Sequence, residues 1–191
     1  MTRLGPLNLA NQLTLLRLVL VPAFALLVVY GEFGWALVVF VSAGLTDGLD
    51  GLIARLTNSR TALGAFLDPL ADKLLLVTTF VVLSLPGIGL TNRLPVWLTV
   101  LIISRDVVIV ATVAIVNLAM GPRTFTPSIY GKAATATYIV YASVVMLFNY
   151  LGRTSILVEV GKWASLTLAI VSAAHYFFQA RRIINEPPPS S

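Results

Sequence analysis

Half of the eight acidic residues of the chain lie between positions 47 and 72, as Asp47, Asp50, Asp68 and Asp72. The first pair is three residues apart and the second pair four, and either spacing brings two side chains to one face of an α-helix. A short polar segment, LTNSRTA, separates the two pairs. It would make the two helices antiparallel neighbours, so we expect the four carboxylates to converge.

Clustered carboxylates in or near a bilayer repel one another and lose hydration, so they need a partner or a cavity. Magnesium and manganese ions prefer carboxylate oxygens and keep positions open for phosphate. The cluster therefore predicts a site for two divalent cations, Mg²⁺ or Mn²⁺, that clamp a diphosphate for in-line displacement at phosphorus. The alternative, helix-capping aspartates on a solvated loop, accounts for Asp68 but not for all four residues at helical spacing.

The residues between the aspartates suit a phosphate ligand. Gly51 and Gly64 permit the close approach of a ligand or a neighbouring backbone, and Ala54 keeps the same face shallow. Arg55 and Arg60 can balance carboxylates or bind phosphate.

Long apolar segments flank this cluster on both sides. The chain is 58% hydrophobic and only 11% charged, whereas about a quarter of a soluble domain is charged. Apolar runs of about 20 residues recur, which is the length that crosses a bilayer as a helix. We therefore predict an all-α integral membrane protein. Its six transmembrane helices are expected at about 11–29, 35–55, 64–85, 96–118, 132–150 and 156–180.

The distribution of arginines predicts the orientation of these helices. Six spans place both termini on one side of the membrane. The bias of basic residues toward the termini and the second and fourth connections favours the cytoplasmic side. The aspartate cluster is then cytoplasmic too. We expect one domain over residues 1–185 and a disordered tail over 186–191. The net charge of +5 fits anionic membrane lipids better than nucleic acid.

Polar residues recur every third position near the N-terminus, as Asn8, Asn11, Thr14 and Arg17. These steps keep the four residues on one slowly drifting helix face. Two interpretations remain open. The segment is either an amphipathic helix on the membrane surface, or its polar face lines a site shared with the aspartates.

The segment from Asp47 to Asp72 reads D-x-x-D-G-x-x-A-R, eight residues, then G-x-x-x-D-x-x-x-D. This pattern resembles the signature of the CDP-alcohol phosphatidyltransferase family, and all eight fixed positions match. The resemblance implies six transmembrane helices with an N-terminal amphipathic surface helix, and commonly a homodimer. It also implies transfer of a substituted phosphate from a CDP-linked donor to an alcohol, with release of CMP.

The resemblance further assigns roles to the matching positions. The four aspartates would bind two divalent cations on the donor diphosphate, and Asp72 would also be the general base for the attacking hydroxyl. Spacing alone does not choose Asp72 over Asp68 for that second role. The donor site would include the small and basic signature residues Gly51, Ala54, Arg55 and Gly64.

The stretches NLANQLTLLRLVLVP and LGAFLDPLADK resemble the part of the family that uses CDP-diacylglycerol and an anionic acceptor. That part contains phosphatidylglycerophosphate synthases, which use glycerol 3-phosphate, and cardiolipin synthases of the eukaryotic type, which use phosphatidylglycerol. GKAAT is similar to the first group and favours glycerol 3-phosphate. Arg105-Asp106 is similar to the second and leaves phosphatidylglycerol as the alternative. The expected acceptor residues are Arg105, Lys132, Asn11 and Arg60.

Two expectations concern the surroundings of Arg105. We expect it in the middle or outer half of its span and Lys132 at the cytoplasmic start of the next, so that they lie at different depths. Asp106 should point to another helix face and be a poor partner for Arg105. A proton-coupled transporter is the alternative from another functional class. It predicts carboxylates along a midplane pathway and repeated halves, and the sequence has neither.

Overall fold

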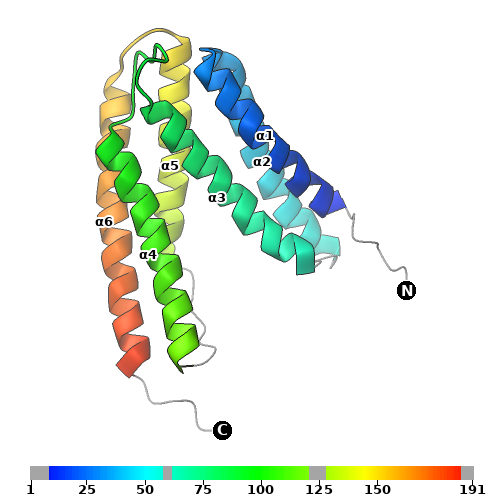
Figure 1. The fold of residues 1–191 in the computed structure, drawn as a ribbon, viewed down its shortest axis with the longest axis vertical. Helices are drawn as coiled ribbons and strands as arrows, with labels where there is room; N and C mark the ends of the chain where they lie inside the picture. Colours follow the sequence, from blue (N-terminus) through cyan, green and yellow to red (C-terminus); the bar gives the residue numbers. More distant parts are fainter. Residues whose placement is uncertain (1–8, 58–61, 121–127, 186–191) are drawn as a thin grey trace. The chain divides into compact units, whose positions relative to one another are not determined.

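The computed structural model describes residues 9–57, 62–120 and 128–185, and these residues form six α-helices (Figure 1). The helices are α1 (Leu9–Val29), α2 (Phe33–Thr57), α3 (Ala62–Ser84), α4 (Val96–Met120), α5 (Ile129–Tyr150) and α6 (Ile156–Asn185). The predicted all-helical class is confirmed. The largest difference in a helix end is at the end of α6, which was expected near 180 and lies at Asn185. The predicted tail over 186–191 lies outside the described residues.

The chain divides into two compact units. The first contains Met1–Leu94 and Ala142–Thr154, and thus α1, α2 and α3. The second contains Pro95–Tyr141 and Ser155–Ser191, and thus α4 and α6. Helix α5 contributes its first part to the second unit and its last part to the first.

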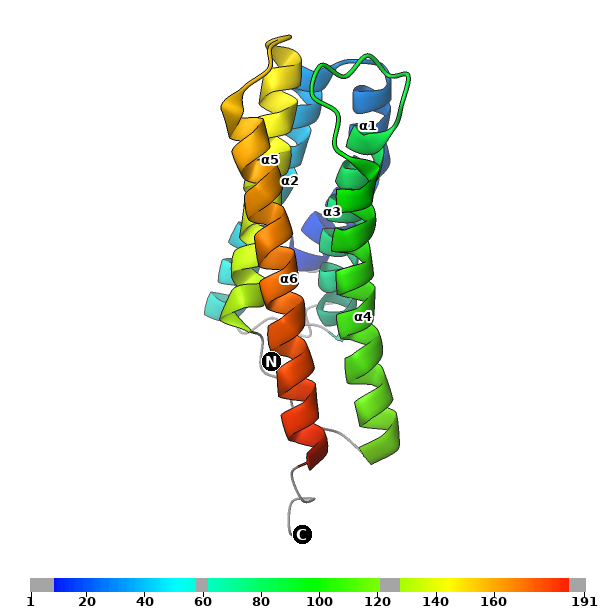
Figure 2. The ribbon, with the colours of Figure 1, turned by 90° about the vertical axis from the view of Figure 1, so that its left-hand side faces the viewer.

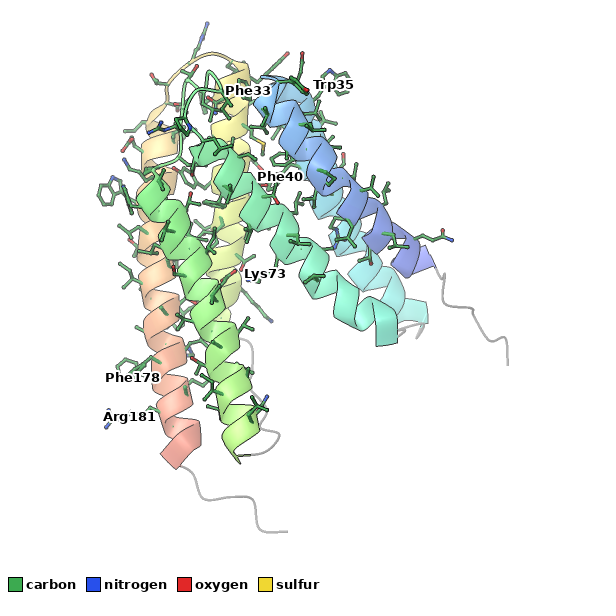
Figure 3. All side chains as sticks on the ribbon, viewed as in Figure 1. Phe33, Trp35, Phe40, Lys73, Phe178 and Arg181 are labelled. Atoms are coloured by element: carbon green, nitrogen blue, oxygen red, sulfur yellow. The ribbon has the colours of Figure 1, made fainter. Side chains whose placement is uncertain are left out.

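In the first unit, α1 packs against both α2 and α3, while α2 and α3 contact each other at few positions. Figure 1 shows the three helices side by side, with α1 and α3 running in the same direction and α2 in the opposite one. The tight turn between α1 and α2 uses Gly31, whose φ of 79° is a conformation that glycine adopts without strain. The rings of Phe24 on α1 and Phe40 on α2 pack against each other, with centroids 5.8 Å apart; Phe40 is labelled in Figure 3.

Helix α1 is continuous from Leu9 to Val29 and includes Pro22. Thr14 and Arg17 are 0% and 1% exposed. Since α1 packs against α2 and α3, this burial places both polar residues in the interior of the first unit. It favours the interpretation in which the polar face lines the interior over the one in which it lies on a membrane surface. Asn8 is outside the described residues, and Asn11 lies in α1.

In the second unit, α4 and α6 pack side by side (Figure 2). The buried apolar residues Leu98 and Ile102 of α4 and Ala169 of α6 belong to its core. Buried polar residues also occur here, among them Arg105 and Asp106 on α4 and Ser172 on α6. A buried charged pair needs compensation from neighbouring groups, and the surroundings of this pair are described below.

Three described helices are long and apolar enough to cross a membrane: Val96–Leu118, Ile129–Tyr150 and Ile156–Arg182. Two shorter apolar stretches of the described residues, Thr14–Val29 and Phe33–Thr46, belong to α1 and α2. Large apolar side chains are exposed on the outside of the helices, such as Phe178, which projects from α6 (Figure 3). Such a surface is typical of a membrane protein. The crossing of the membrane by all six helices stays a prediction.

A pair of buried asparagines joins the α3–α4 connection to the end of α5 within the first unit. The backbone N–H of Asn92 donates to Oδ1 of Asn149 at 2.8 Å, and Nδ2 of Asn149 donates to the carbonyl of Asn92 at 3.1 Å. The side-chain Nδ2 of Asn92 donates to the carbonyl of Arg153 at 2.7 Å. One side chain, that of Asn149, thus satisfies both backbone groups of Asn92.

We expect Asn149→Leu to lower the unfolding temperature of the purified protein by several degrees. The substitution removes both bonds to the buried backbone of Asn92, and a buried polar group left unsatisfied costs roughly 1–3 kcal/mol. Thermal unfolding in detergent measures the effect. Thr91→Ala, at an exposed neighbouring position, is the control and should unfold like the parent. An unchanged unfolding temperature in Asn149→Leu would contradict the role of this pair.

Candidate active site

All four aspartates of the sequence cluster belong to the first unit. Asp47 and Asp50 lie in the C-terminal half of α2, and Asp68 and Asp72 lie in the N-terminal half of α3. Asp72 is half-buried. The side chains of the other three are outside what the structure describes. Among the described side chains, no three His, Cys, Asp or Glu residues lie close enough together to hold a metal ion.

The positions of the aspartates along the helices can be compared. Helix α3 ends at Ser84, and α2 begins at Phe33. At a rise of about 1.5 Å per residue, Asp72 lies about 18 Å before Ser84, and Asp47 lies about 21 Å after Phe33. Figure 1 shows these two helix ends at the same end of the three-helix unit. Asp47 and Asp72 therefore lie at a similar level, as convergence of the two pairs requires.

The remaining signature residues lie in the same helices. Gly51, Ala54 and Arg55 are in α2, and Gly64 is in α3. Their side-chain surroundings are not described, and Arg60 falls in the segment 58–61 that lies outside the described residues. The donor-site assignments of these residues stay predictions.

Arg105 lies in a polar cluster of the second unit. Its side chain is 7% exposed, and its Nη1 donates a hydrogen bond to Oδ1 of Asp106 at 2.6 Å. Its Nη2 donates to the hydroxyl of Ser172 on α6, and its Cζ lies 6.0 Å from the centroid of the Tyr176 ring. The expectation that Asp106 is a poor partner for Arg105 is wrong, because the long arginine side chain reaches the carboxylate of the next residue.

Lys132 lies near the start of α5 and is exposed. A Cβ atom on Gly131, the residue before it, would lie 3.3 Å from Nη2 of Arg105 and 3.4 Å from the Tyr176 ring. The start of α5 therefore lies directly against the guanidinium group. The expectation that Arg105 and Lys132 lie at different depths is wrong. Helix α4 continues beyond Arg105 to Met120, but α5 does not begin at the level of Met120. It begins near the level of the Arg105 guanidinium group, against which Gly131 lies.

Ser172 and Tyr176 are site neighbours that the sequence did not indicate. Ser172 is 67 residues from Arg105 in the chain, so only the packing of α4 against α6 brings the two together. Arg105 and Tyr176 also line a small cavity of about 70 Å³, together with apolar residues of both helices. Within the described residues, Nε of Arg105 is buried and has no hydrogen-bond partner. The guanidinium thus keeps one donor that an anion could use.

Comparison with known proteins identifies the family. A sequence model of the CDP-alcohol phosphatidyltransferase family matches residues 7–174. The chain belongs to this family. The match covers most of both units and confirms the resemblance of the aspartate segment. As a member of the CDP-alcohol phosphatidyltransferase family, the protein is a phosphatidyltransferase enzyme.

Relatives with two different names are similar over nearly the whole chain. A probable phosphatidylglycerophosphate synthase of Mycobacterium tuberculosis is 35% identical over 185 residues, covering 93% of this chain and 83% of the relative. A CMP-forming cardiolipin synthase of Streptomyces coelicolor is 34% identical, covering 93% and 85%. The CMP-forming cardiolipin synthase of Homo sapiens is 34% identical, covering 94% and 64%. The comparisons therefore fix the family and leave both acceptors open.

Proposed function

We propose that this phosphatidyltransferase transfers the phosphatidyl group of CDP-diacylglycerol to glycerol 3-phosphate, giving phosphatidylglycerol phosphate and CMP. The observation that carries the proposal is the complete family signature on α2 and α3, two antiparallel helices whose Asp47 and Asp72 lie at a similar level. The carboxylates need no transporter pathway to explain them, because the chain belongs to an enzyme family.

The chemistry of the four aspartates fits the binding of divalent cations. Four aspartates offer only oxygen ligands, which suit Mg²⁺ or Mn²⁺ and do not resemble the nitrogen and sulfur sets of structural zinc sites. Asp72 is half-buried on α3, so its charge is partly removed from water and favours a cationic partner. Asp47, Asp50, Asp68 and Asp72 would hold two such ions, which would neutralise the charge of the donor diphosphate.

The residues of the chain supply the remaining steps. Asp72 accepts the proton of the acceptor hydroxyl, because a neutral alcohol is a weak nucleophile. The acceptor oxygen forms a bond to the β-phosphorus of the donor, which carries the diacylglycerol, and the bond from that phosphorus to CMP breaks. Gly51, Ala54 and Gly64 leave room for the donor, and Arg55 binds its phosphate.

The acceptor is an anion, and Arg105 and Lys132 are the proposed residues that bind it. Both belong to the second unit, where Gly131, the residue before Lys132, lies against the guanidinium group of Arg105. Arg105 also keeps a buried N–H donor without a hydrogen-bond partner among the described residues. Asn11 and Arg60 are further candidates for the same role. Gly131 and Lys132 belong to the GKAAT stretch, which is similar to phosphatidylglycerophosphate synthases and therefore favours glycerol 3-phosphate as the acceptor. Phosphatidylglycerol remains the alternative, supported by Arg105-Asp106 and by the relatives named cardiolipin synthase.

The proposal includes the surroundings of the enzyme. We place all six helices across the membrane, with the termini and the aspartate site on the cytoplasmic side. This agrees with the arginine-rich termini and connections. We also propose a homodimer, which the family resemblance implies.

The experiment is a CMP-release assay on purified protein with CDP-diacylglycerol, Mg²⁺ and one acceptor at a time. Glycerol 3-phosphate should support CMP release and a lipid product, and a chelator should stop both. CMP release with phosphatidylglycerol but not with glycerol 3-phosphate would establish the alternative acceptor. Absence of CMP release with glycerol 3-phosphate, phosphatidylglycerol and inositol phosphate would refute the proposed reaction.

A further inference from the structure

We propose that Arg17 is a positioning residue of the active site, which balances the charge of the aspartate cluster through Asp72. This inference rests on the proposed function, because it concerns the same four carboxylates. It assigns a role to Arg17 on the polar face of α1, a residue that belongs neither to the family signature nor to the proposed acceptor site.

The first observation is burial. Arg17 is 1% exposed and is the largest of the fully buried side chains among the described residues. A guanidinium group does not lose its proton in a protein, so a positive charge lies inside the three-helix unit. Such a charge is strongly unfavourable unless a carboxylate lies near it.

The second observation is the short supply of acidic residues in this unit. Its two segments contain five acidic residues, Glu32 and the four aspartates of the cluster. Glu32 is exposed at the turn after α1, beyond Val29. Arg17 lies about 18 Å before Val29 along the helix axis, a separation that exceeds the reach of an arginine side chain. Among the carboxylates of this unit, the aspartates are therefore the ones within reach of Arg17.

The third observation is the common level of Arg17 and Asp72. Each lies about 18 Å before the C-terminal end of its helix, Val29 for α1 and Ser84 for α3. The two helices run in the same direction and pack against each other, with their C-terminal ends at the same end of the unit (Figure 1). Packed helix axes are about 8–10 Å apart, a gap that an arginine and an aspartate can bridge. Both residues take part in at least one interaction.

Lys73 is the competing cation for Asp72. It follows Asp72 directly on α3 and is half-buried. Consecutive residues of a helix point about 100° apart, so Lys73 can reach Asp72 only by bending its long side chain along the helix, as Arg105 does toward Asp106. Arg17 comes from the neighbouring helix and is the more deeply buried of the two cations. This favours Arg17 as the charge that holds Asp72.

A fixed positive charge has a clear use in such a site. Without metal and donor, four carboxylates repel one another and would separate α2 from α3. Arg17, on the helix that packs against both, reduces this repulsion and holds Asp72 in place for its proton transfer. The protein can then remain folded between catalytic cycles, when the cations have left.

The test is a double-mutant cycle of Arg17→Met and Asp72→Asn, measured as the thermal unfolding temperature in detergent with a chelator. Arg17→Met should lower the unfolding temperature of the parent strongly, and by less than half as much when Asp72→Asn is also present. Arg17→Lys should recover most of the loss. In Arg17→Met, added Mg²⁺ should raise the unfolding temperature more than it does in the parent.

Two control substitutions accompany the cycle. Arg93→Met removes an exposed arginine of the same unit and should show no coupling to Asp72→Asn. Lys73→Met tests the competing cation. An equal effect of Arg17→Met with and without Asp72→Asn would overturn the proposal, as would coupling of Asp72 to Lys73 alone. If Arg17→Met yields no folded protein, recovery by Asp72→Asn supports the proposal and no recovery overturns it. The cycle measures unfolding without substrate, so it tests the role of Arg17 separately from the proposed reaction. Failure of the parent protein to release CMP would refute the reaction and leave the result of the cycle unchanged.

Discussion

Asp72→Asn is expected to reduce CMP release roughly a thousandfold or more while the helices remain folded. The substitution removes the carboxylate that accepts the hydroxyl proton, and general-base catalysis alone contributes about 100-fold to 10,000-fold. It also removes a proposed cation ligand, so the two losses act on the same step. Initial rates of CMP release at saturating CDP-diacylglycerol and glycerol 3-phosphate measure the effect, and circular dichroism checks the helix content.

The comparison with Asp68 makes this prediction specific. Asp68→Asn removes a cation ligand but not the base, so added Mg²⁺ should recover part of its activity, whereas Asp72→Asn should not respond. Glu32→Gln, at an exposed acidic position of the same unit, is the matched control and should keep the parent rate. If Asp72→Asn recovers with Mg²⁺ and Asp68→Asn does not, the base is Asp68.

The sequence predicts the helices well because their pattern is local. Apolar runs of the length that crosses a bilayer, separated by polar or glycine-containing connections, give all six helices in order. The aspartate pairs are also read from local spacing, three and four residues within one helix. The levels of Asp47 and Asp72 then follow from counting residues along α2 and α3, once the structure shows which helix ends lie together.

The sequence predicts the surroundings of Arg105 and Arg17 poorly because these depend on contacts between helices. Whether the polar face of α1 lies on a membrane surface or inside the protein cannot be decided from its three-residue period. The burial of Thr14 and Arg17 favours the interior. Likewise, Ser172 reaches Arg105 only through the packing of α6 on α4. The pairing of Arg105 with Asp106 depends on the conformation of a long side chain, which helix periodicity does not describe.

Arg105→Met is expected to raise the KM for glycerol 3-phosphate roughly tenfold to a hundredfold, with little change in the KM for CDP-diacylglycerol. A charge-assisted hydrogen bond from arginine to phosphate is about twice as strong as a neutral one, and methionine keeps the apolar stem but offers no donor. Initial rates with varied acceptor and saturating donor give the first KM, and the converse experiment gives the second. Arg181→Met, at an exposed arginine of α6 (Figure 3), is the matched control and should change neither.

The bond between Arg105 and Asp106 determines how this experiment must be read. Arg105→Met removes that bond and with it the positive charge beside the buried carboxylate of Asp106. The loss of one partner of a buried ion pair strongly destabilises the fold. The double variant with Asp106→Asn removes both charges, so its unfolding temperature should return toward that of the parent. If Arg105 binds the acceptor, the raised KM for glycerol 3-phosphate should persist in this more stable variant. A KM that returns to the parent value together with stability would show that Arg105 only joins α4 to α6, and the acceptor site would then depend on Lys132.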